Sequence, residues 1–346
     1  MQRSKLWARL KSWEALLFII LCVVIFVNLR LSSHYLDLNN LANIFHLSIE
    51  KSLMVLIMAF VIINGEIDLS VASIMALGAT VLAERYEAGW SIAAGLALAL
   101  LVGLGCGLLN GLFVAYMGIP SLIVTLAGQI GYRGAARIIL EDRSVGDFPK
   151  WFTSLGQDGF IGPFPITSFL FLALFILGLV VLQYSVFGRY VYAIGNNRAA
   201  AEYAGINAKQ VKVTLFMLSG LIAALAGACY AARLGNVRAN AAEGFELDVI
   251  TIVLLGGVSI FGGTGTMLGV GLSLLVVLNL RNGMSLSNVD GNTQTSVVGS
   301  LLILSVLIPN WMQRLQRLLS HLFAKNPKLF NRGGAAEPKS PVSVHQ

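Results

Sequence analysis

Long apolar runs separated by short polar segments are the feature that most constrains this sequence. A helix needs roughly 20 apolar residues to cross the hydrocarbon core of a bilayer, and inside a bilayer only helices and closed barrels satisfy their backbone polar groups. The runs are long and continuous, as in helices. The sequence therefore predicts an all-α, polytopic membrane protein with about ten transmembrane helices, at 15–31, 48–64, 67–84, 91–116, 119–140, 164–184, 211–232, 249–262, 265–282 and 294–309.

Composition and charge support this class and exclude others. The chain is 56% hydrophobic and only 12% charged, whereas a soluble domain carries about 25% charged residues. The net charge of +7 does not indicate nucleic-acid binding, because many of the basic residues gather before the first run, within 187–212 and after the last run. This is the positive-inside pattern of membrane topology. It predicts a multi-pass membrane protein in contact with lipid; the bacterial inner (cytoplasmic) membrane is what the family resemblance described below implies.

The charge pattern also divides the chain. We expect a basic cytoplasmic N-terminus at 1–14, a transmembrane domain at 15–312, and a cytoplasmic, partly disordered tail at 313–346. Six runs precede the segment 187–212 and four follow it, so both termini and this segment can lie in the cytoplasm. The acidic segment 141–163 then becomes an ordered external loop.

The segment 187–212 is a polar, basic interruption between two apolar runs. Asn196–Asn197 can start a short helix, Arg198–Ala204 favour one, and Gly205 can end it in a left-handed cap. Asn207 then resembles the N-cap of the next apolar helix. The segment is predicted to form one small surface helix, which has the shape of a docking element.

Two arginines stand inside an apolar run. Arg133 and Arg137 are four residues apart and so share one helical face, near Gln129. At the bilayer centre each would cost about 2.5–3.5 kcal/mol, against about 0.3–0.6 kcal/mol gained per Leu or Ile. They must therefore lie toward the external end or face an aqueous path, and both a structural ion pair and a path-lining role stay open.

An acidic pair precedes one of the apolar runs. Glu66 and Asp68 can serve as a proton relay, or can cap the helix that begins near Leu69. Glu246 and Asp248 stand similarly before a later run, and the ten-span count puts the two pairs on opposite faces, as in an inverted repeat. Both the repeat and coincidence remain open.

Glycines cluster within the apolar runs. Close helix packing explains most of them, because small residues let backbones approach each other. The stretch 256–265 is dense enough in glycine to predict a broken helix, which must be buried or line a wet cavity. The residues we expect on the translocation path or its gate are Glu66, Asp68, Gln129, Arg133, Arg137 and Ser259.

Motifs of other functions are missing from the sequence. No glycine is followed by the Lys-Ser/Thr of a P-loop, no Ser-His-Asp or Cys-His set indicates catalysis, and the histidines never pair at metal-ligand spacing. We therefore expect a transport protein that is not an enzyme and holds no metal. A pump built on this chain would need a partner for ATP hydrolysis.

Four segments in order resemble one family. Gly65–Gly78, Gly107–Gly128, Gly188–Gly205 and Leu247–Gly265 are similar to the permease subunits of bacterial ABC importers for ribose, rhamnose, other simple sugars and autoinducer-2. The resemblance covers nearly all of the chain from about residue 15 to 312. It implies an importer that moves a monosaccharide (rhamnose- or ribose-like) or an autoinducer-2-like solute inward.

The resemblance also implies partners and a coupling helix. The partners are ABC ATP-binding subunits, which hold ATP and Mg²⁺, a second permease copy or paralogue, and a periplasmic solute-binding protein; this chain would bind no cofactor. The helix at 196–206 would sit in a groove of the ATPase. Its coupling residues would be Asn197, Arg198, Ala199, Ala201, Glu202, Ala204 and Gly205. The alternative function is a proton-coupled secondary transporter of a small solute using Glu66, Asp68 and the arginines Arg133 and Arg137.

Overall fold

The computed structural model describes residues 13–141, 143–158, 160–301, 303–304 and 307. Residues 1–12 of the predicted N-terminus 1–14, the predicted tail 313–346 and part of the last apolar run lie outside these residues. The elements named below belong to one compact unit that ends at Leu302. They are almost all helices, as the sequence predicts, with one short antiparallel pair of strands.

The first half of this unit holds α2 to α8. In chain order its elements are α2 Trp13–Leu31, α3 Leu38–His46, α4 Ile49–Ile63, α5 Val71–Glu87, α6 Ile92–Ala115, α7 Ser121–Leu140, β1 Ser144–Gly146 and α8 Lys150–Gln157. The second half holds α9 Ile166–Tyr184, α10 Val186–Asn196, α11 Arg198–Tyr203, α12 Ala208–Leu234, β2 Asn236–Arg238, α13 Phe245–Leu255 and α14 Met267–Leu286.

Several of these helices have the length and composition of membrane spans. Five of the described helices pass both criteria: α2, α6, α9, α12 and α14. The pair α3 and α4, bent by 51°, makes a sixth if it counts as one span. The chain is thus an all-α polytopic membrane protein. The count of about ten stays a prediction, because elements such as α13, with 11 residues, are too short to pass this test.

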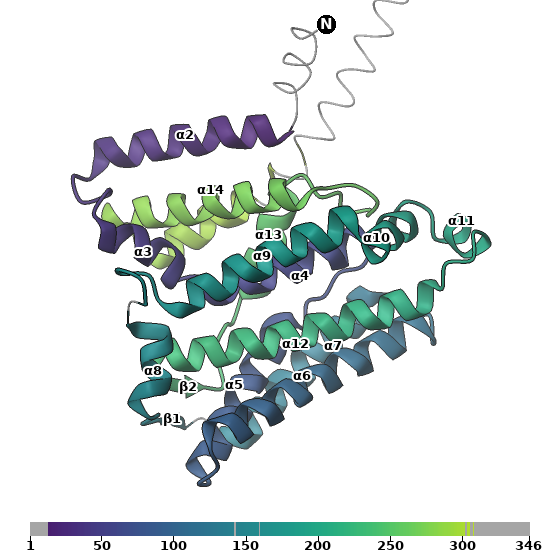
Figure 1. The fold of residues 1–346 in the computed structure, drawn as a ribbon, viewed down its shortest axis with the longest axis horizontal. Coiled ribbons are helices and arrows are strands. Elements are labelled where there is room, and N and C mark those ends of the chain that lie inside the picture. The colour runs from purple at the N-terminus through teal and green to yellow at the C-terminus, as the bar shows by residue number, and fades with distance from the viewer. Residues whose placement is uncertain (1–12, 142, 159, 302, 305–306, 308–346) are drawn as a thin grey trace, which may run out of the picture. The chain divides into compact units, whose positions relative to one another are not determined.

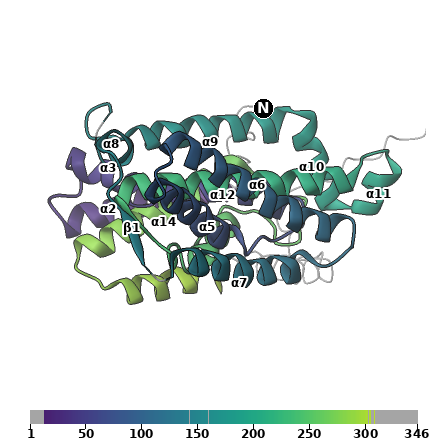
Figure 2. The same ribbon diagram turned by 90° about the horizontal axis from the view of Figure 1, so that it is seen from below.

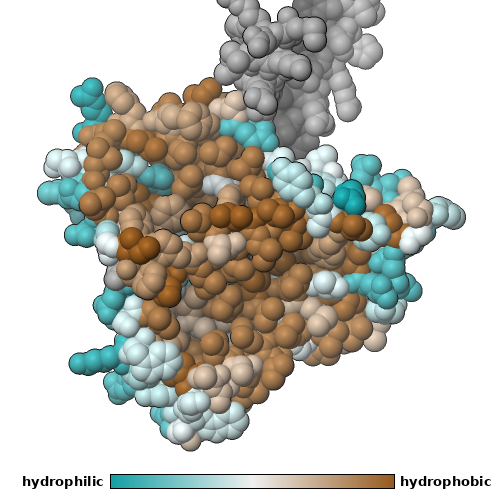
Figure 3. Space-filling model, in the orientation of Figure 1, coloured by the Kyte–Doolittle hydropathy of each residue, from teal (hydrophilic) through white to brown (hydrophobic). Residues whose placement is uncertain are grey.

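The surface agrees with a protein that lies in a bilayer. Figure 3 shows a broad hydrophobic face over the helices, with hydrophilic residues gathered at its left and right margins. These margins coincide with the two ends of the helices in Figure 1. Exposed residues of α9, such as Leu172, Ile176 and Val180, are therefore suited to contact acyl chains.

The helices end in two distinct regions. In both Figure 1 and Figure 2, α10 and α11 lie at one end of the helices, and α8 lies with β1 at the other. We call these the α11 end and the α8 end. The long helix α12 runs between them, because it follows α11 and leads into β2, which pairs with β1.

Glycines hold α6 and α12 in backbone contact. A Cβ added to Gly103 would lie 2.4 Å from the carbonyl oxygen of Gly220, and one on Gly107 would lie 2.2 Å from that of Phe216. A Cβ on Gly220 would in turn meet the Gly103 carbonyl at 2.0 Å. The prediction that small residues serve close helix packing is confirmed at these positions.

The stretch after α13 is irregular, as its glycines predict. α13 ends at Leu255, and α14 begins only at Met267. Gly257, Gly262 and Gly263 have φ values of 85°, 83° and 76°, which residues with a Cβ rarely adopt. We call residues 256–266 the glycine turn.

Candidate functional site

The polar segment at the α11 end contains two helices. The sequence predicts one, and this is wrong, because α10 (Val186–Asn196) precedes α11. The Ser185 hydroxyl accepts a hydrogen bond from the Gly188 N–H and caps α10. Ser185 is a recognisable N-cap, but Gly188 and Gly195 inside α10 argue against a helix when only local propensity is considered.

The short helix α11 begins and ends where the sequence predicts. The side chain of Asn197 accepts a hydrogen bond from the Ala200 N–H at 3.0 Å. At the other end Gly205 has φ +85°, and its N–H and that of Ile206 donate to the carbonyls of Glu202 and Ala201. This is a Schellman motif. The helix therefore has a fixed geometry although it has only six residues.

Most of α11 is open to a partner. Arg198 and Glu202 form an ion pair at 2.9 Å, with both side chains 44% exposed, and Tyr203 is 94% exposed. Ala199, Ala204 and Gly205 are exposed as well. Ala201 is 4% exposed, so this residue of the predicted coupling set packs inward and anchors the helix to its own chain.

Backbone contacts join α10 to the rest of the α11 end. Gly195 approaches the end of α4 so closely that an added Cβ would lie 1.9 Å from the Ile63 carbonyl oxygen and 2.7 Å from the Gly263 nitrogen. The Gly263 N–H itself donates to Ile63 at 2.8 Å. Gly195 thus touches both the end of α4 and the glycine turn, and we call this contact the glycine junction.

Further hydrogen bonds reinforce the glycine junction. The Tyr192 hydroxyl donates to the Gly265 carbonyl at 2.7 Å, and the Asn64 amide donates to the Val191 carbonyl at 3.4 Å. Ser259 lies in the same turn, where its hydroxyl accepts from the Phe261 N–H. α10 therefore makes direct contacts with two irregular segments, residues 64–70 and the glycine turn.

One of those segments, residues 64–70, carries the first acidic pair. Glu66 forms a buried ion pair with Lys212, near the start of α12. Asp68 is fully buried and accepts hydrogen bonds from the Ser70 N–H at 2.9 Å, from the Ser70 hydroxyl and from the Ser219 hydroxyl, both at 2.6 Å. These bonds hold the residues that lead into α5.

The hydrogen-bonded network around Asp68 continues to α6 and α7. The Asn110 amide donates to the Ser70 hydroxyl at 2.8 Å, and the Tyr132 hydroxyl donates to the side-chain oxygen of Asn110 at 2.9 Å. No cation pairs with Asp68 within the described residues. The carboxylate is held by hydroxyl and backbone donors just before α5, and both the capping and the proton-relay interpretations of the acidic pair stay predictions.

The polar strip of α7 faces the segment after β2. The Gln129 amide donates to Glu246 at 2.7 Å, Arg133 donates to the carbonyls of Ala239 and Ala241, and Arg137 pairs with Glu243 at 2.9 Å. These side chains border a cavity of about 550 Å³. We call it the polar cavity; its lining is Gln129, Ile130, Arg133, Gly134, Arg137, Glu243, Gly244 and Glu246.

The predicted path residues therefore form two groups. Glu66, Asp68 and Ser259 lie around the two irregular segments toward the α11 end, whereas Gln129, Arg133 and Arg137 lie together at the polar cavity. Sequence reasoning missed the partners, which are Lys212, Ser219, Glu243 and Glu246 among others. The only signal for Glu246 was its place in the faint repeat.

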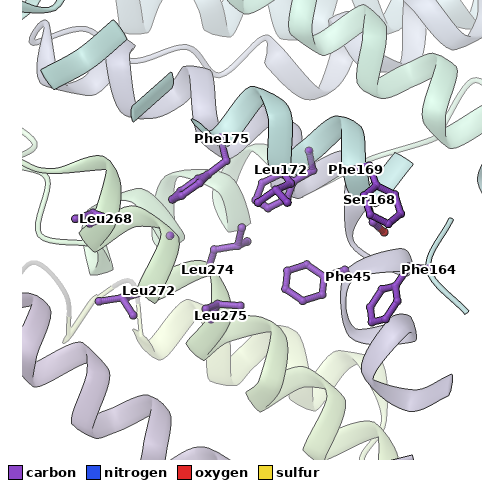
Figure 4. A pocket seen from close by; sticks show the side chains of 12 residues that line it. Phe45, Phe164, Ser168, Phe169, Leu172, Phe175, Leu268, Leu272, Leu274 and Leu275 are labelled. Atoms are coloured by element: carbon purple, nitrogen blue, oxygen red, sulfur yellow. The ribbon is translucent and has the colours of Figure 1, made fainter. Parts of the chain in front are cut away.

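A second cavity has a different character. It measures about 540 Å³ and lies between α9, α14 and the end of α3. Figure 4 shows phenylalanine and leucine side chains around it; its lining is Phe45, Phe164, Ser168, Phe169, Phe171, Leu172, Phe175, Leu268, Gly271, Leu272, Leu274 and Leu275. With Ser168 as the sole polar residue of that set, it offers a hydrophilic solute few hydrogen bonds.

Comparison with known proteins places the chain in a family. The family model described as "Branched-chain amino acid transport system / permease component" matches residues 40–307. The ribose import permease protein RbsC of Escherichia coli K12 is 33% identical over 88% of this chain and 96% of its own length. The L-arabinose ABC transporter permease protein AraH of Azospirillum brasilense is 38% identical over 76% of this chain and 77% of its own length.

A third relative is the xylose transport system permease protein XylH of Haemophilus influenzae, which is 30% identical over 87% of this chain and 97% of its own length. No solved structure matches the chain. The matches lie with transport permeases, so they support the prediction of an importer subunit that is not an enzyme and give no support to the proton-coupled alternative. The chain belongs to the family of transport-system permease components.

Proposed function

We propose that this chain is the permease subunit of an ATP-driven ABC importer that moves a monosaccharide across the bacterial inner membrane. Relatives named for ribose, arabinose and xylose support a pentose-like substrate. The other candidate solutes, which the family resemblance implies, are rhamnose-like and autoinducer-2-like. The chain works with ATP-binding subunits that hold ATP and Mg²⁺, with a second permease copy, and with a periplasmic solute-binding protein.

The observation that carries this proposal is the glycine junction. α11 presents an exposed, capped surface, and α10 behind it contacts both the end of α4 and the glycine turn through backbone atoms. An ATPase that pushes on α11 therefore moves two segments of the membrane domain together. Joint movement of these two segments is suited to alternating access, in which one end of a path opens while the other closes.

The orientation follows from the same proposal. The α11 end faces the cytoplasm, because the ATPase is there, and the α8 end with the polar cavity faces the periplasm. Both termini lie in the cytoplasm by the positive-inside rule. The second permease copy completes the path along the open side of the polar strip on α7, and the segment 141–163 meets the solute-binding protein.

The experiment is sugar uptake in proteoliposomes that hold the whole complex, with ATP hydrolysis measured in parallel. Glu202→Lys places a second positive charge beside Arg198 on the exposed face of α11, and Gly205→Pro cannot adopt the φ of +85°. Both variants are expected to abolish uptake and its coupling to ATP hydrolysis while the protein still inserts in the membrane.

The matched control is Glu87→Lys. Glu87 pairs with Arg143 in an exposed ion pair at the α8 end, so this variant reverses a comparable charge far from α11. It is expected to keep uptake. Unchanged uptake and complex assembly in Glu202→Lys and Gly205→Pro would reject the role of α11 as the coupling helix.

A further inference from the structure

The two most exposed large apolar side chains in the described part of the chain both lie toward the α11 end. Tyr203, the last residue of α11, is 94% exposed, and Phe261, in the glycine turn, is 84% exposed. On the bilayer-facing helix α9, by comparison, Leu172 and Ile176 are 51% and 53% exposed. Aromatic side chains that stand out of a surface in this way are typical anchors of protein–protein contacts.

Tyr203 and Phe261 belong to segments that are in backbone contact. A Cβ added to Gly263 would lie 2.8 Å from the Cα of Asn196, and the next residue, Asn197, caps α11. Phe261 stands two residues before Gly263. α11 and the tip of the glycine turn therefore form one continuous surface, which we call the two-part surface (residues 197–205 and 259–262).

The backbone that carries Phe261 is ordered by hydrogen bonds. The Phe261 N–H donates to the Ser259 hydroxyl at 3.2 Å, and the Gly262 N–H donates to the Ser259 carbonyl at 2.9 Å. The Ser259 N–H in turn donates to the carbonyl of Thr264 at 3.1 Å. The ring is thus presented by a fixed turn, which reduces the conformational entropy lost when a partner covers it.

Acyl chains are poor partners for Phe261. Its segment is irregular from the end of α13 at Leu255 to the start of α14 at Met267, and irregular backbone does not face lipid within the hydrocarbon core, because its polar groups would lack partners. The turn also adjoins Glu14 in the first turn of α2, which accepts from the Thr266 hydroxyl at 2.9 Å, and a carboxylate is costly in that core. Phe261 therefore lies at the wet end of the helices, where burial of its ring by a protein is favourable.

We propose that the ATP-binding subunit docks on both halves of the two-part surface, and that the ring of Phe261 enters an apolar pocket of that subunit beside the groove for α11. This inference rests on the proposed function, which assigns α11 to the ATPase. It adds a second contact on the other side of the glycine junction. The ATPase then holds α11 and the glycine turn at once, so both sides of the junction move with it.

The first experiment measures the affinity of the ATPase for the permease. The ATP-binding subunit of the wild-type complex is purified and titrated onto the full chain in nanodiscs of phosphatidylethanolamine and phosphatidylglycerol. Phe261→Ala is expected to weaken binding about tenfold or more, as the loss of an aromatic anchor does, and Phe261→Leu, which keeps an apolar side chain, is expected to lose less. Because the ring is exposed in the free chain, neither variant is expected to change thermal unfolding.

The matched control is Phe160→Ala. Phe160 is 66% exposed in the connection between α8 and α9, at the α8 end. The substitution removes the same ring at the opposite end of the helices and is expected to leave the ATPase affinity unchanged. Wild-type affinity of Phe261→Ala, or an equal loss in Phe160→Ala, would overturn the second contact.

A photoreactive ring identifies the partner directly. Phe261 is replaced by p-benzoylphenylalanine, the assembled complex is irradiated, and the adducts are separated by mass. A covalent adduct with the ATP-binding subunit supports the proposal. Adducts with lipid or with a second permease copy alone, or no adduct when the same group in place of Tyr203 gives one with the ATPase, would overturn it.

Failure of the proposed function would give a different result. If the wild-type chain assembles with no ATP-binding subunit, the proposed function fails and this inference fails with it. If the complex assembles and the α11 variants lose uptake, but Phe261→Ala binds the ATPase as the wild type does, α11 remains the coupling helix and only the contact at Phe261 is rejected.

Discussion

The two acidic segments of the chain begin alike and are held differently. At 64–70, Glu66 pairs with Lys212 and Asp68 is enclosed by hydroxyl and backbone donors. At the α8 end, Asp248 pairs with both Lys51 and Arg281, while Glu246 accepts a hydrogen bond from Gln129 beside the polar cavity. The first segment is enclosed and contacts α10 through Asn64, whereas the second borders the polar cavity. We therefore expect the first segment, and not the second, to transmit motion from α10.

The largest effect is expected where a buried carboxylate has charged partners, as Asp248 does, and not neutral ones, as Asp68 does. Asp248→Asn leaves two cations, Lys51 and Arg281, without their carboxylate, at sites where they are 12% and 21% exposed. We expect a loss of about 3–5 kcal/mol in the free energy of unfolding in micelles. Asp68→Asn removes a carboxylate with neutral partners and is expected to cost about 1–3 kcal/mol. Equal losses would contradict the comparison.

The lysines Lys212 and Lys51 allow the ion pairs of the two segments to be compared directly. Lys212→Met leaves Glu66 buried without its cation and is expected to cost about 3 kcal/mol. Lys51→Met leaves Asp248 with Arg281, which donates at 2.8 and 2.9 Å, so the expected loss is smaller. Thermal unfolding of the two variants side by side measures this difference. A larger loss of stability in Lys51→Met than in Lys212→Met would contradict the expectation that Arg281 compensates for the missing lysine.

The glycine junction is tested by Gly195→Ala. Its Cβ would overlap the Ile63 carbonyl, so the backbones must separate, at about 1–3 kcal/mol in unfolding free energy. Because the contact joins α10 to two segments, ATP hydrolysis is expected to continue while uptake is lost. Gly105→Ala, at a helical glycine of α6 with open space, is the control. Wild-type uptake by Gly195→Ala would remove the junction from the mechanism.

The smallest effect is expected at the rim of the polar cavity. Arg137 and Glu243 are about half exposed, and exposed ion pairs contribute about 0–1 kcal/mol. Glu243→Gln should therefore leave the unfolding free energy nearly unchanged, in contrast to Asp248→Asn only five residues later. A loss comparable to that of Asp248→Asn would mean that the rim pair is buried in the assembled complex.

Local features of the chain could be predicted from its sequence. The caps at Asn197, Gly205 and Asn207 depend on residues within three or four positions, and the structure has all three. Apolar length likewise placed α2, α6 and α9 to within two residues. The broken helix after α13 was visible because its glycines adjoin one another in the sequence.

The pairings could not be predicted, because they join distant residues. Lys51 and Asp248 are 197 residues apart, and Glu50 and Arg233 are 183 apart, so no spacing rule connects them. The faint repeat did suggest that the two acidic pairs lie toward opposite ends, and their partners agree: Lys212 is near the start of α12 and Lys51 near the start of α4. The inverted repeat itself stays a prediction.

The helix α12 has a mechanical consequence. It is 27 residues long, or about 40 Å, and is pinned twice to α4 and the residues after it: Lys212 to Glu66 near one end, Arg233 to Glu50 at the other. A rod held at two separated points can neither slide nor pivot against its neighbour. Glycines hold α6 against α12, so we expect these two helices to move as one body. Motion that α10 passes to residues 64–70 must then either carry α12 and α6 along or break the Glu66–Lys212 ion pair.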